Sequence, residues 1–419
     1  MKLEIPRYPT GPNVRLLSRP ARHLPLLSTF AFVAIALVQP RLYAATASVN
    51  LGSTSQTIRG FGGAVIWEAP LPDADCDILF GSGAGTIGFT IERVRVAPVS
   101  SDWGNDVANA QKAKARGAIV FATPWSPPAS MKDNNNIVHG SLLTSQYGAF
   151  ATYLNNFVAQ CASNNASLYA VSIQNEPDFN PDYEGCTYTP TQMFNFAKNN
   201  AGVISTKVIA AETVQFNHGY TDPILNDATA RANVDVIGGH LYGNGIIDYP
   251  LARSSGKEVW MTEHLNLDTS ITGQMQTAKE ILDCLAVSNY NAYIWWQMKR
   301  DYGPVNLAGQ RTKRGCVFAQ FARIVRPGWV RVNATYNPAS GVVVAAFKSG
   351  SRMAIIAINS STSTVSQAFS ISGGTIPTSL NCWRTSASQD LATLAAVGVS
   401  GGGFTNSLPG QSITTFYTP

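Results

Sequence analysis

Eight short apolar runs, each followed by a longer stretch of mostly helical periodicity, dominate the sequence between residues 58 and 297. The runs are rich in β-branched and aromatic residues, which is typical of buried strands. They lie at residues 58–64, 93–97, 118–123, 169–175, 206–211, 234–240, 258–263 and 291–297. Eight strands with intervening helices over roughly 250 residues predict an α/β fold, a (β/α)8 TIM barrel. An open doubly wound sheet is the alternative, but no Gly-x-Gly-x-x-Gly joins the first strand directly to a helix.

After about residue 329 the sequence changes character, because alternating apolar runs replace the succession of strands and helices. These runs lie at 329–335, 341–347, 353–358, 364–371 and 411–417. Period-two alternation without helices is typical of an antiparallel β-sandwich. We therefore expect the barrel at 58–328 and an attached β-sandwich side domain at 329–419, with a strand at 48–57 that joins the side domain.

Residues 1–47 have the pattern of a secretory signal peptide, with basic residues, an apolar run at 24–38 and small residues at 44–47. The apolar run is shorter than the ~20 residues of a spanning helix, so export is favoured over a membrane anchor. This segment carries the whole formal charge of +5, since the rest has 24 basic and 24 acidic residues. A chain without a basic field is not expected to bind nucleic acid or, after signal cleavage, a membrane.

Six cysteines follow the signal segment, without Cys-x-x-Cys or the Cys/His spacing of a zinc site. In an exported chain an even number favours disulfide bonds, and buried free thiols are the alternative. Neither a His-x-x-x-His motif nor a carboxylate cluster indicates a metal, so we expect neither a metal nor another cofactor.

Two glutamates stand where strands of the predicted barrel end. Glu176 follows the fourth strand in an Asn-Glu-Pro motif, and Glu263 closes the seventh. Catalytic groups of a barrel gather at the C-terminal ends of its strands, and strands four and seven lie across the mouth from one another. Two carboxyl groups about 5 Å apart suit acetal hydrolysis with retention, in which one protonates the leaving oxygen and the other attacks the anomeric carbon. Salt-bridged loop residues are the alternative, and Glu212 at the end of the fifth strand is the competing carboxylate.

These motifs resemble glycoside hydrolase family 30, whose members are retaining barrel glycosidases. The resemblance covers essentially the whole chain after the signal segment. Its motifs are Asn175-Glu-Pro, Trp260-Met-Thr-Glu, Gly60-Phe-Gly-Gly, Pro124-Trp-Ser-Pro-Pro, His240-Leu-Tyr-Gly, Tyr293-Ile-Trp-Trp, Lys299-Arg-Asp-Tyr-Gly-Pro, Lys313-Arg-Gly and Arg326-Pro-Gly. The resemblance implies that Glu176 is the acid/base and Glu263 the nucleophile.

Within the family, the run that contains Trp296, Arg300 and Tyr302 is most similar to the secreted glucuronoxylanases, endo-acting enzymes that recognise a 4-O-methylglucuronic acid branch on xylan. That likeness implies that these three residues form the subsite for the branch. A guanidinium pairs bidentately with a carboxylate, and aromatic rings flank the sugar. Taken alone, Arg300 would be a surface arginine paired with Asp301 or solvated.

The chain departs from this pattern at three positions. Leu265 stands where some glucuronoxylanases have an aromatic residue, Asp268 where they have a Ser, and Lys299 where the family often has a second Arg. An acid at Asp268 would repel a uronate, which argues against strict dependence on the branch but leaves the hydrolytic chemistry unaffected.

The resemblance also implies supporting roles. Asn175 would hydrogen-bond the 2-hydroxyl of the sugar at the cleavage point, and Tyr242 would orient the nucleophile unless it is a core tyrosine. Trp67, Trp103 and Trp125 lie just past the first three strands and are expected to stack on sugar faces, with core packing as the alternative.

The mechanism requires a protonated Glu176 when substrate binds. We predict that its surroundings and the charge of Glu263 raise the pKa of Glu176, while hydrogen bonds keep Glu263 ionised. A bell-shaped pH profile on the acidic side of neutral should result. His240 and His264 are expected beside the carboxylates as hydrogen-bonding neighbours.

Three functions are compatible with these observations. The first is a secreted, monomeric, retaining endo-β-1,4-xylanase that cleaves glucuronoxylan under the direction of the glucuronic acid branch. The second is a family 30 glycosidase acting on undecorated xylan or another β-glycan, such as a β-1,6-glucanase or a glucosylceramidase. The third is a carbohydrate-binding protein with little or no turnover, which the presence of both glutamates disfavours.

Overall fold

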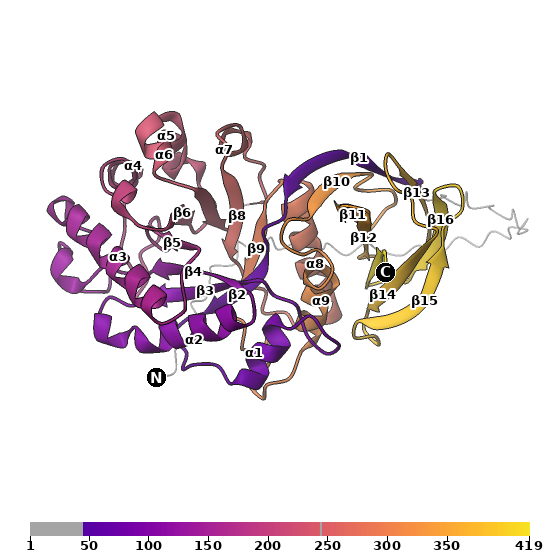
Figure 1. Ribbon diagram of the computed structural model, residues 1–419, viewed down its shortest axis with the longest axis horizontal. Helices are drawn as coiled ribbons and strands as arrows, with labels where there is room; N and C mark the ends of the chain where they lie inside the picture. Colours follow the sequence, from indigo (N-terminus) through magenta and orange to yellow (C-terminus); the bar gives the residue numbers. More distant parts are fainter. Residues whose placement is uncertain (1–44, 244) are drawn as a thin grey trace, which may run out of the picture. The chain divides into compact units, whose positions relative to one another are not determined.

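Eight parallel strands close into a barrel in the computed structural model, which describes residues 45–243 and 245–419 (Figure 1). The strands are β2 (Gly60–Val65), β3 (Ile91–Val96), β4 (Ile119–Pro124), β5 (Ala170–Ser172), β6 (Lys207–Thr213), β7 (Val236–His240), β8 (Glu258–Glu263) and β9 (Ala292–Trp295). Each pairs in parallel with the next, and β9 pairs with β2 to close the barrel. The eight runs found in the sequence correspond one to one to these strands, so the predicted fold class is confirmed.

Every barrel strand is followed by a helix. The helices are α1 (Asp73–Phe80), α2 (Gly104–Ala115), α3 (Tyr147–Ser163), α4 (Pro190–Asn199), α5 (Asp222–Asn226), α6 (Ala228–Ala232), α7 (Pro250–Ser254), α8 (Ile271–Ala286) and α9 (Lys313–Ala322). Local sequence explains where several of them begin. Thr189 and Gln192 form a capping box at the start of α4, whose first residue is Pro190. Ser270 and Thr312 are simple N-caps of α8 and α9, and the side chain of each accepts a backbone N–H of the first turn.

A separate cluster of buried apolar side chains draws on seven of the eight barrel strands. It consists of Ile91, Phe121, Ala170, Ile209, Val236, Trp260, Ala292 and Ile294. Several of these are the first residues of their strands, so the cluster lies toward the N-terminal end of the barrel. A packed interior of this kind leaves the C-terminal ends of the strands as the place for a functional site.

The remaining strands form a nine-stranded sheet in the order β15-β14-β17-β12-β11-β10-β1-β13-β16. They are β1 (Ala47–Thr57), β10 (Val330–Ala334), β11 (Val342–Ser349), β12 (Arg352–Asn359), β13 (Val365–Ser372), β14 (Ser379–Thr385), β15 (Ala392–Gly398), β16 (Gly403–Leu408) and β17 (Ser412–Tyr417). All neighbours are antiparallel except β1 and β13, which are parallel. Phe369 and Phe404, near one edge, pack against Phe416 of β17 with ring centroids 5.4 and 5.1 Å apart. The sheet therefore folds over on itself and encloses its own core.

Strand β1 leads directly into the barrel, and backbone hydrogen bonds fasten the junction. The N–H of Ile58 donates to the carbonyl of Trp329 at 2.7 Å, and the N–H of Gly328 donates to the carbonyl of Ile58 at 3.0 Å. The side chain of Gln320 in α9 donates to Thr385 of β14 at 2.9 Å in buried surroundings. The sheet thus packs against the outer helices α8 and α9.

The cysteines correct the expectation of disulfide bonds. All six cysteines lie in the described part of the chain, and all are free and buried. They belong to separate elements: Cys76 to α1, Cys161 to α3, Cys186 to a loop, Cys284 to α8, Cys316 to α9 and Cys382 to β14. Each therefore acts as a small apolar side chain, which was the alternative interpretation.

Residues 1–44 of the predicted signal peptide lie outside the described residues; Ala45 and Thr46 are described, and Ala47 begins β1. In the described part of the chain, no helix combines the length and the apolar character that crossing a bilayer requires.

Candidate active site

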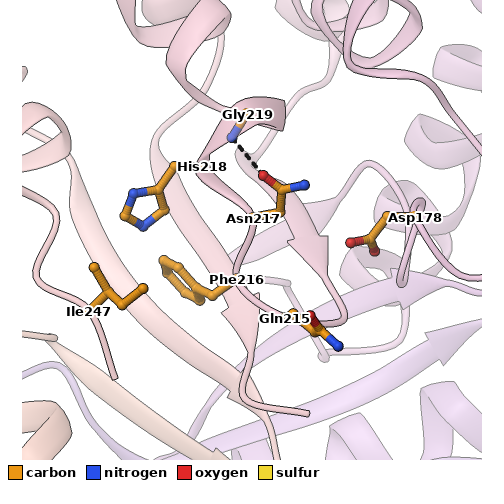
Figure 2. A pocket seen from close by; sticks show the side chains of 7 residues that line it. All are labelled: Asp178, Gln215, Phe216, Asn217, His218, Gly219 and Ile247. Carbon is orange, nitrogen blue, oxygen red and sulfur yellow. Dashed lines mark hydrogen bonds between the residues drawn. The ribbon is translucent and has the colours of Figure 1, made fainter. Parts of the chain in front are cut away.

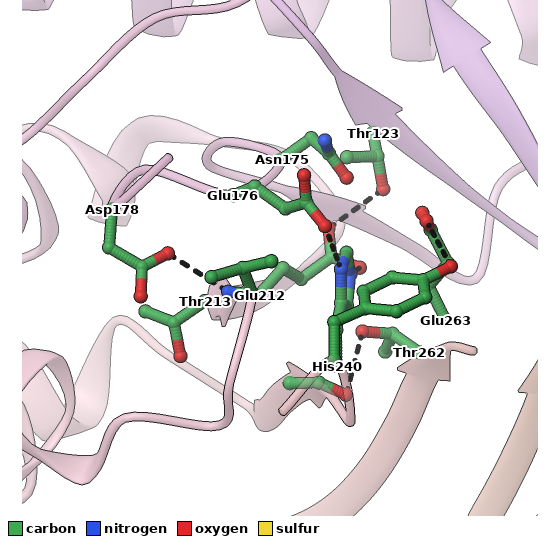
Figure 3. A network of polar contacts seen from close by, with 12 residues as sticks. Thr123, Asn175, Glu176, Asp178, Glu212, Thr213, His240, Thr262 and Glu263 are labelled. Carbon is green, nitrogen blue, oxygen red and sulfur yellow. Dashed lines mark hydrogen bonds and ion pairs between the residues drawn. The ribbon is translucent and has the colours of Figure 1, made fainter. Parts of the chain in front are cut away.

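Glu176 and Glu263 are brought together at the C-terminal end of the barrel strands (Figure 3). Glu263 is the last residue of β8, and Glu176 follows the short strand β5. An oxygen of each carboxyl group and a ring nitrogen of His240 all lie within 4.8 Å of one another. Both residues are nearly buried, at 5% and 7% exposure. This separation is in the range at which two carboxyl groups act on one glycosidic bond with retention.

The backbone holds Glu176 in an unusual conformation. Its φ is +43°, a region that costs a residue with a side chain about 1–3 kcal/mol. Two backbone hydrogen bonds to neighbouring strands fix this loop. The N–H of Glu176 donates to the carbonyl of Glu212 at 3.0 Å, and the N–H of Asn175 donates to that of Pro124 at 2.9 Å. Such strain is retained where the surrounding structure must aim a side chain.

Arg93 of β3 is fully buried and connects the polar groups of the site. Its guanidinium contacts Glu263, lies 3.2 Å from Glu212 Oε1 and donates to Asn175 Oδ1 at 2.7 Å. Burial lowers the pKa of Arg93, but the facing carboxylates outweigh burial and raise it above its ordinary value. Arg93 was not among the site residues predicted from the sequence. Its signal is an arginine inside an apolar parallel strand, because such a charge is buried only when it is paired.

His240 ends β7 and is also fully buried. Its Nδ1 lies 2.9 Å from Glu176 Oε1, and its Nε2 lies 3.8 Å from Glu212 Oε1. Burial lowers the pKa of His240, but Glu263, Glu176 and Glu212 outweigh it and raise the pKa to about 9. A protonated His240 donates to Glu176 and fixes the direction of its carboxyl group. The partner of His264 is instead Glu280, at 2.7 Å.

The pKa of Glu176 is raised, as predicted from the sequence. Burial is the largest cause and the charge of Glu263 adds to it, while His240 and Arg93 oppose them. The site thus holds three carboxyl groups, including Glu212, against two cationic groups. One further proton on Glu176 leaves this buried cluster neutral, which suits a group that must donate a proton.

Glu212 is poorly suited to the role of the acid. It is fully buried, and the hydroxyl of Thr123 donates to its Oε2 at 2.9 Å. Burial raises the pKa of Glu212, but Arg93 and His240 outweigh burial and lower it to about 2. Glu212 therefore stays ionised and is out of reach of a substrate at the mouth.

Tyr242 and Asn175 both lie at the site. The hydroxyl of Tyr242 donates to Glu263 Oε1 at 3.0 Å, and Arg93 contacts the other oxygen. Asn175 is 5% exposed, and its Oδ1 is held by Arg93. Glu263 is thus oriented through both of its oxygens.

Three tryptophans form one aromatic cluster at the mouth. Trp67, Trp125 and Trp296 have ring centroids 5.3 to 6.1 Å apart, and Tyr183 packs on Trp67 at 6.0 Å. Trp125 is almost fully buried, whereas Trp67 and Trp296 are partly exposed. The guanidinium of Arg93 lies 4.7 Å from the Trp125 ring, which ties the cluster to the carboxylates.

Trp103 is not part of this cluster, which corrects its predicted role. Its ring packs edge-on against Tyr153 and Phe157 of α3, at 5.2 and 5.1 Å. Its indole N–H donates to the carbonyl of Ala97 at 3.0 Å, and the residue is 7% exposed. Trp103 therefore fixes the start of α2 against α3 and offers no face to a sugar.

Arg300 and Tyr302 follow β9 and are partly exposed. Arg300 forms an ion pair with Glu68, a residue that the sequence analysis did not single out. Burial raises the pKa of Tyr302 while Arg300 lowers it, and Glu263 and Glu68 raise it further, so this hydroxyl lies within electrostatic reach of all three. Lys299 is engaged elsewhere, in an ion pair with Asp75 of α1.

A pocket of about 310 Å³ lies beyond the end of β6 (Figure 2). It is lined by Asp178, Gln215, Phe216, Asn217, His218, Gly219 and Ile247. The ring of Phe216 stacks on Tyr290 and that of His218 stacks on Tyr249, with centroids 5.3 and 3.6 Å apart. The tryptophan cluster is the better platform for a sugar, because Trp67 and Trp296 are partly exposed and Arg93 connects the cluster to the carboxylates.

Glu176, His240 and Glu263 also have the ligand types of a metal site. The guanidinium of Arg93 contacts Glu263, however, and His240 is paired with Glu176. Together with a proton on Glu176, these positive groups balance the carboxylates, so the arrangement favours proton transfer over metal binding.

A sequence profile described as glycosyl hydrolase family 59 matches residues 101–312. Over the longer range of 391 residues, the chain is 38% identical to the glucuronoxylanase XynC of Bacillus subtilis strain 168. This alignment covers 90% of the present chain and 92% of the relative.

The barrel and the paired carboxyl groups define the class of protein, a barrel glycoside hydrolase. A family 30 subfamily 8 xylanase from Clostridium acetobutylicum has a similar structure, with a TM-score of 0.86, 40% identity and coverage of 89% of this chain and 99% of the other. A family 30 endoxylanase from Clostridium papyrosolvens C71 is also similar in structure, with a TM-score of 0.83 and 41% sequence identity. The alignment covers 89% of this chain and 99% of the endoxylanase. The chain belongs to glycoside hydrolase family 30.

Proposed function

We propose that this chain is a retaining endo-β-1,4-xylanase that cleaves glucuronoxylan at positions set by the 4-O-methylglucuronic acid branch. The observation that carries the proposal is the approach of Glu176 and Glu263 to within 4.8 Å in a nearly buried site. The choice of xylan is supported by the relatives, which are named as glucuronoxylanase, xylanase and endoxylanase.

In the first step Glu176 gives its proton to the leaving glycosidic oxygen while Glu263 attacks the anomeric carbon. The raised pKa of Glu176 keeps the proton available. Tyr242 and Arg93 each contact one oxygen of Glu263, so the nucleophile is already oriented for attack before the sugar binds.

In the second step the ester at Glu263 is hydrolysed by a water molecule that Glu176 deprotonates. Forming the ester removes the negative charge of Glu263, which is one of the causes of the raised pKa of Glu176. The acid of the first step therefore becomes a base in the second. His240 stays beside Glu176 throughout and stabilises its ionised form.

Branch recognition is assigned to Arg300, Tyr302 and Trp296. The guanidinium would pair with the uronate carboxylate, and the rings would flank the sugar. Trp296 belongs to the tryptophan cluster, and Tyr302 lies within electrostatic reach of Glu263. A branch bound here is thus adjacent to the cleavage point.

The test is a digest of glucuronoxylan beside arabinoxylan and linear xylan, with proton NMR of the first product. We expect acidic oligosaccharides from glucuronoxylan and a β-configured reducing end before mutarotation. Glu176→Gln and Glu263→Ala should abolish hydrolysis, and Arg300→Ala should abolish the preference for glucuronoxylan. An α-configured first product would refute the retaining mechanism.

A second candidate is a family 30 xylanase that acts equally on undecorated xylan. The ion pair between Arg300 and Glu68 favours it, because the guanidinium already has a carboxylate partner. Equal rates on linear xylan and glucuronoxylan would decide for this candidate. Binding of xylan without any hydrolysis would instead indicate a carbohydrate-binding protein.

Secretion is a further part of the proposal, and it is based on the signal-like sequence at 1–47. The secreted protein is proposed to be a monomer. N-terminal sequencing of protein from the culture medium should find a start near residues 44–47. Retention of the full chain inside the cell would contradict it.

A further inference from the structure

The ion pair between Glu68 and Arg300 has a bearing on substrate choice. Glu68 follows β2, and Arg300 follows β9, the strand beside it. The pair is partly exposed, with side-chain exposures of 25% and 30%, so it lies where a substrate can reach it. The guanidinium of Arg300, beside the proposed substrate cleft, is therefore already paired with the carboxylate of Glu68.

The donors of Arg300 are divided between two acceptors. Nη2 pairs with Glu68 Oε1, and Nη1 donates to the carbonyl of Lys299 at 2.9 Å. A uronate held bidentately needs two parallel N–H groups of the same guanidinium. Glu68 therefore occupies a donor that the uronate would use, and it places a second negative charge beside it.

The neighbours of Glu68 hold it in place. Trp67, the preceding residue, packs against Trp125 and Trp296, and its indole N–H lies 3.4 Å from Glu184. The tryptophan cluster thus anchors the residue next to Glu68.

Asp268, the acid at which the sequence departs from the glucuronoxylanase pattern, is turned elsewhere. Its side chain accepts the N–H of Ser270 at 2.8 Å, ahead of α8, and its carbonyl accepts from Arg314 at 2.8 Å. Of the two acids, Glu68 is the one that faces Arg300.

We propose that Glu68 is a specificity-determining residue, an internal carboxylate that occupies Arg300 in place of the substrate's uronate. When xylan carries no branch, Glu68 neutralises the guanidinium, and undecorated stretches are accepted. When the branch is present, the uronate must displace Glu68 or share Arg300 with it, which weakens selection for the branch. This inference rests on the proposed function, because it assumes that xylan binds across this cleft.

The test compares kcat/KM on glucuronoxylan and on linear xylan for wild type and Glu68→Gln. The amide keeps the shape and removes the charge, so we expect the ratio of the two values to rise about tenfold, which corresponds to the removal of one screened charge repulsion. Glu258→Gln is the matched control. Glu258 forms an ion pair with Arg59, and the side-chain exposures of 24% for Glu258 and 32% for Arg59 are similar to those of the Glu68–Arg300 pair. Glu258 lies at the opposite end of β8 from Glu263, so Glu258→Gln should leave the ratio unchanged.

A double-mutant cycle separates this role from a merely structural one. If Glu68 acts through Arg300, Glu68→Gln should have no effect on the ratio in the Arg300→Ala background. An unchanged ratio for Glu68→Gln in the wild-type background, or an equal rise in both backgrounds, would overturn the inference while leaving the xylanase assignment intact. Absence of xylan hydrolysis in the wild type would overturn the proposed function itself.

Discussion

Replacing Arg93 by Met tests the electrostatic framework that holds the candidate active site. The guanidinium is fully buried, contacts Glu263 and lies 3.2 Å from Glu212. Met fills much of the same volume but leaves both carboxylates without their cation. Removing one partner of a buried ion pair costs about 3–5 kcal/mol. We expect Arg93→Met to lower the free energy of unfolding at pH 7 by that amount.

The pKa of Glu212 gives an independent measure of the stability that Arg93 contributes. Its pKa is lowered from an ordinary value of 4.5 to about 2, although burial alone would raise it. A difference of this size contributes about 3 kcal/mol to stability at neutral pH. The sign follows from the lowered pKa, since this stability is present above about pH 4.5 and is lost as the pH falls toward 2. Without Arg93 the pKa of Glu212 should rise toward or above its ordinary value, so this stabilising contribution, and the loss of stability in acid that it causes, should disappear.

Urea unfolding at pH 7 and at pH 4 measures both effects. Arg59→Met is the control, because its ion pair with Glu258 is partly exposed, and such pairs are worth about 0–1 kcal/mol. The reasoning is refuted if Arg93→Met loses no more stability than Arg59→Met, or if its stability depends on pH as the wild type does.

Three further outcomes are expected. Tyr242→Phe should lower kcat on xylan about tenfold to a hundredfold with little change in KM, because its hydrogen bond orients the nucleophile Glu263; a change confined to KM would contradict this. Trp103→Ala should lower the melting temperature and leave the KM for xylan unchanged, whereas Trp296→Ala should raise that KM. A raised KM for Trp103→Ala with an unchanged KM for Trp296→Ala would show that Trp103 binds sugar. The native protein should resist thiol alkylation, and reducing agents should leave its melting temperature unchanged, because all six cysteines are buried and free; a drop on reduction would reveal a disulfide.

The barrel and the two glutamates were accessible from the sequence for a physical reason. Buried parallel strands read as apolar runs, and a polar residue that ends such a run points to the mouth. Glu176 and Glu263 both stand at such positions, and the structure brings their carboxyl groups together. The position of Tyr242 beside Glu263 was instead implied by the family resemblance.

The side domain was only partly predictable. Strands β14, β15 and β16 are short on large apolar residues, and their alternation is weak in the sequence. The parallel pairing of β1 with β13 joins segments more than 300 residues apart, which no local pattern encodes.

Other features depend on partners distant in the chain. In the sequence Arg93 is a single charged residue within an apolar strand, and its role is not evident because its partners Glu212 and Glu263 lie on other strands. Trp103 ends in the core because α3 supplies Tyr153 and Phe157 as neighbours, although its position after a strand resembles that of Trp125.

Covalent trapping tests the central assignment most directly. A 2-deoxy-2-fluoro xylobioside with an activated leaving group slows the second step and accumulates the glycosyl ester, which peptide mass spectrometry locates. The account predicts a single adduct on Glu263 in the wild type and none in Glu263→Ala. An adduct on Glu176 or Glu212, or turnover of the reagent with inversion and without an adduct, would contradict it.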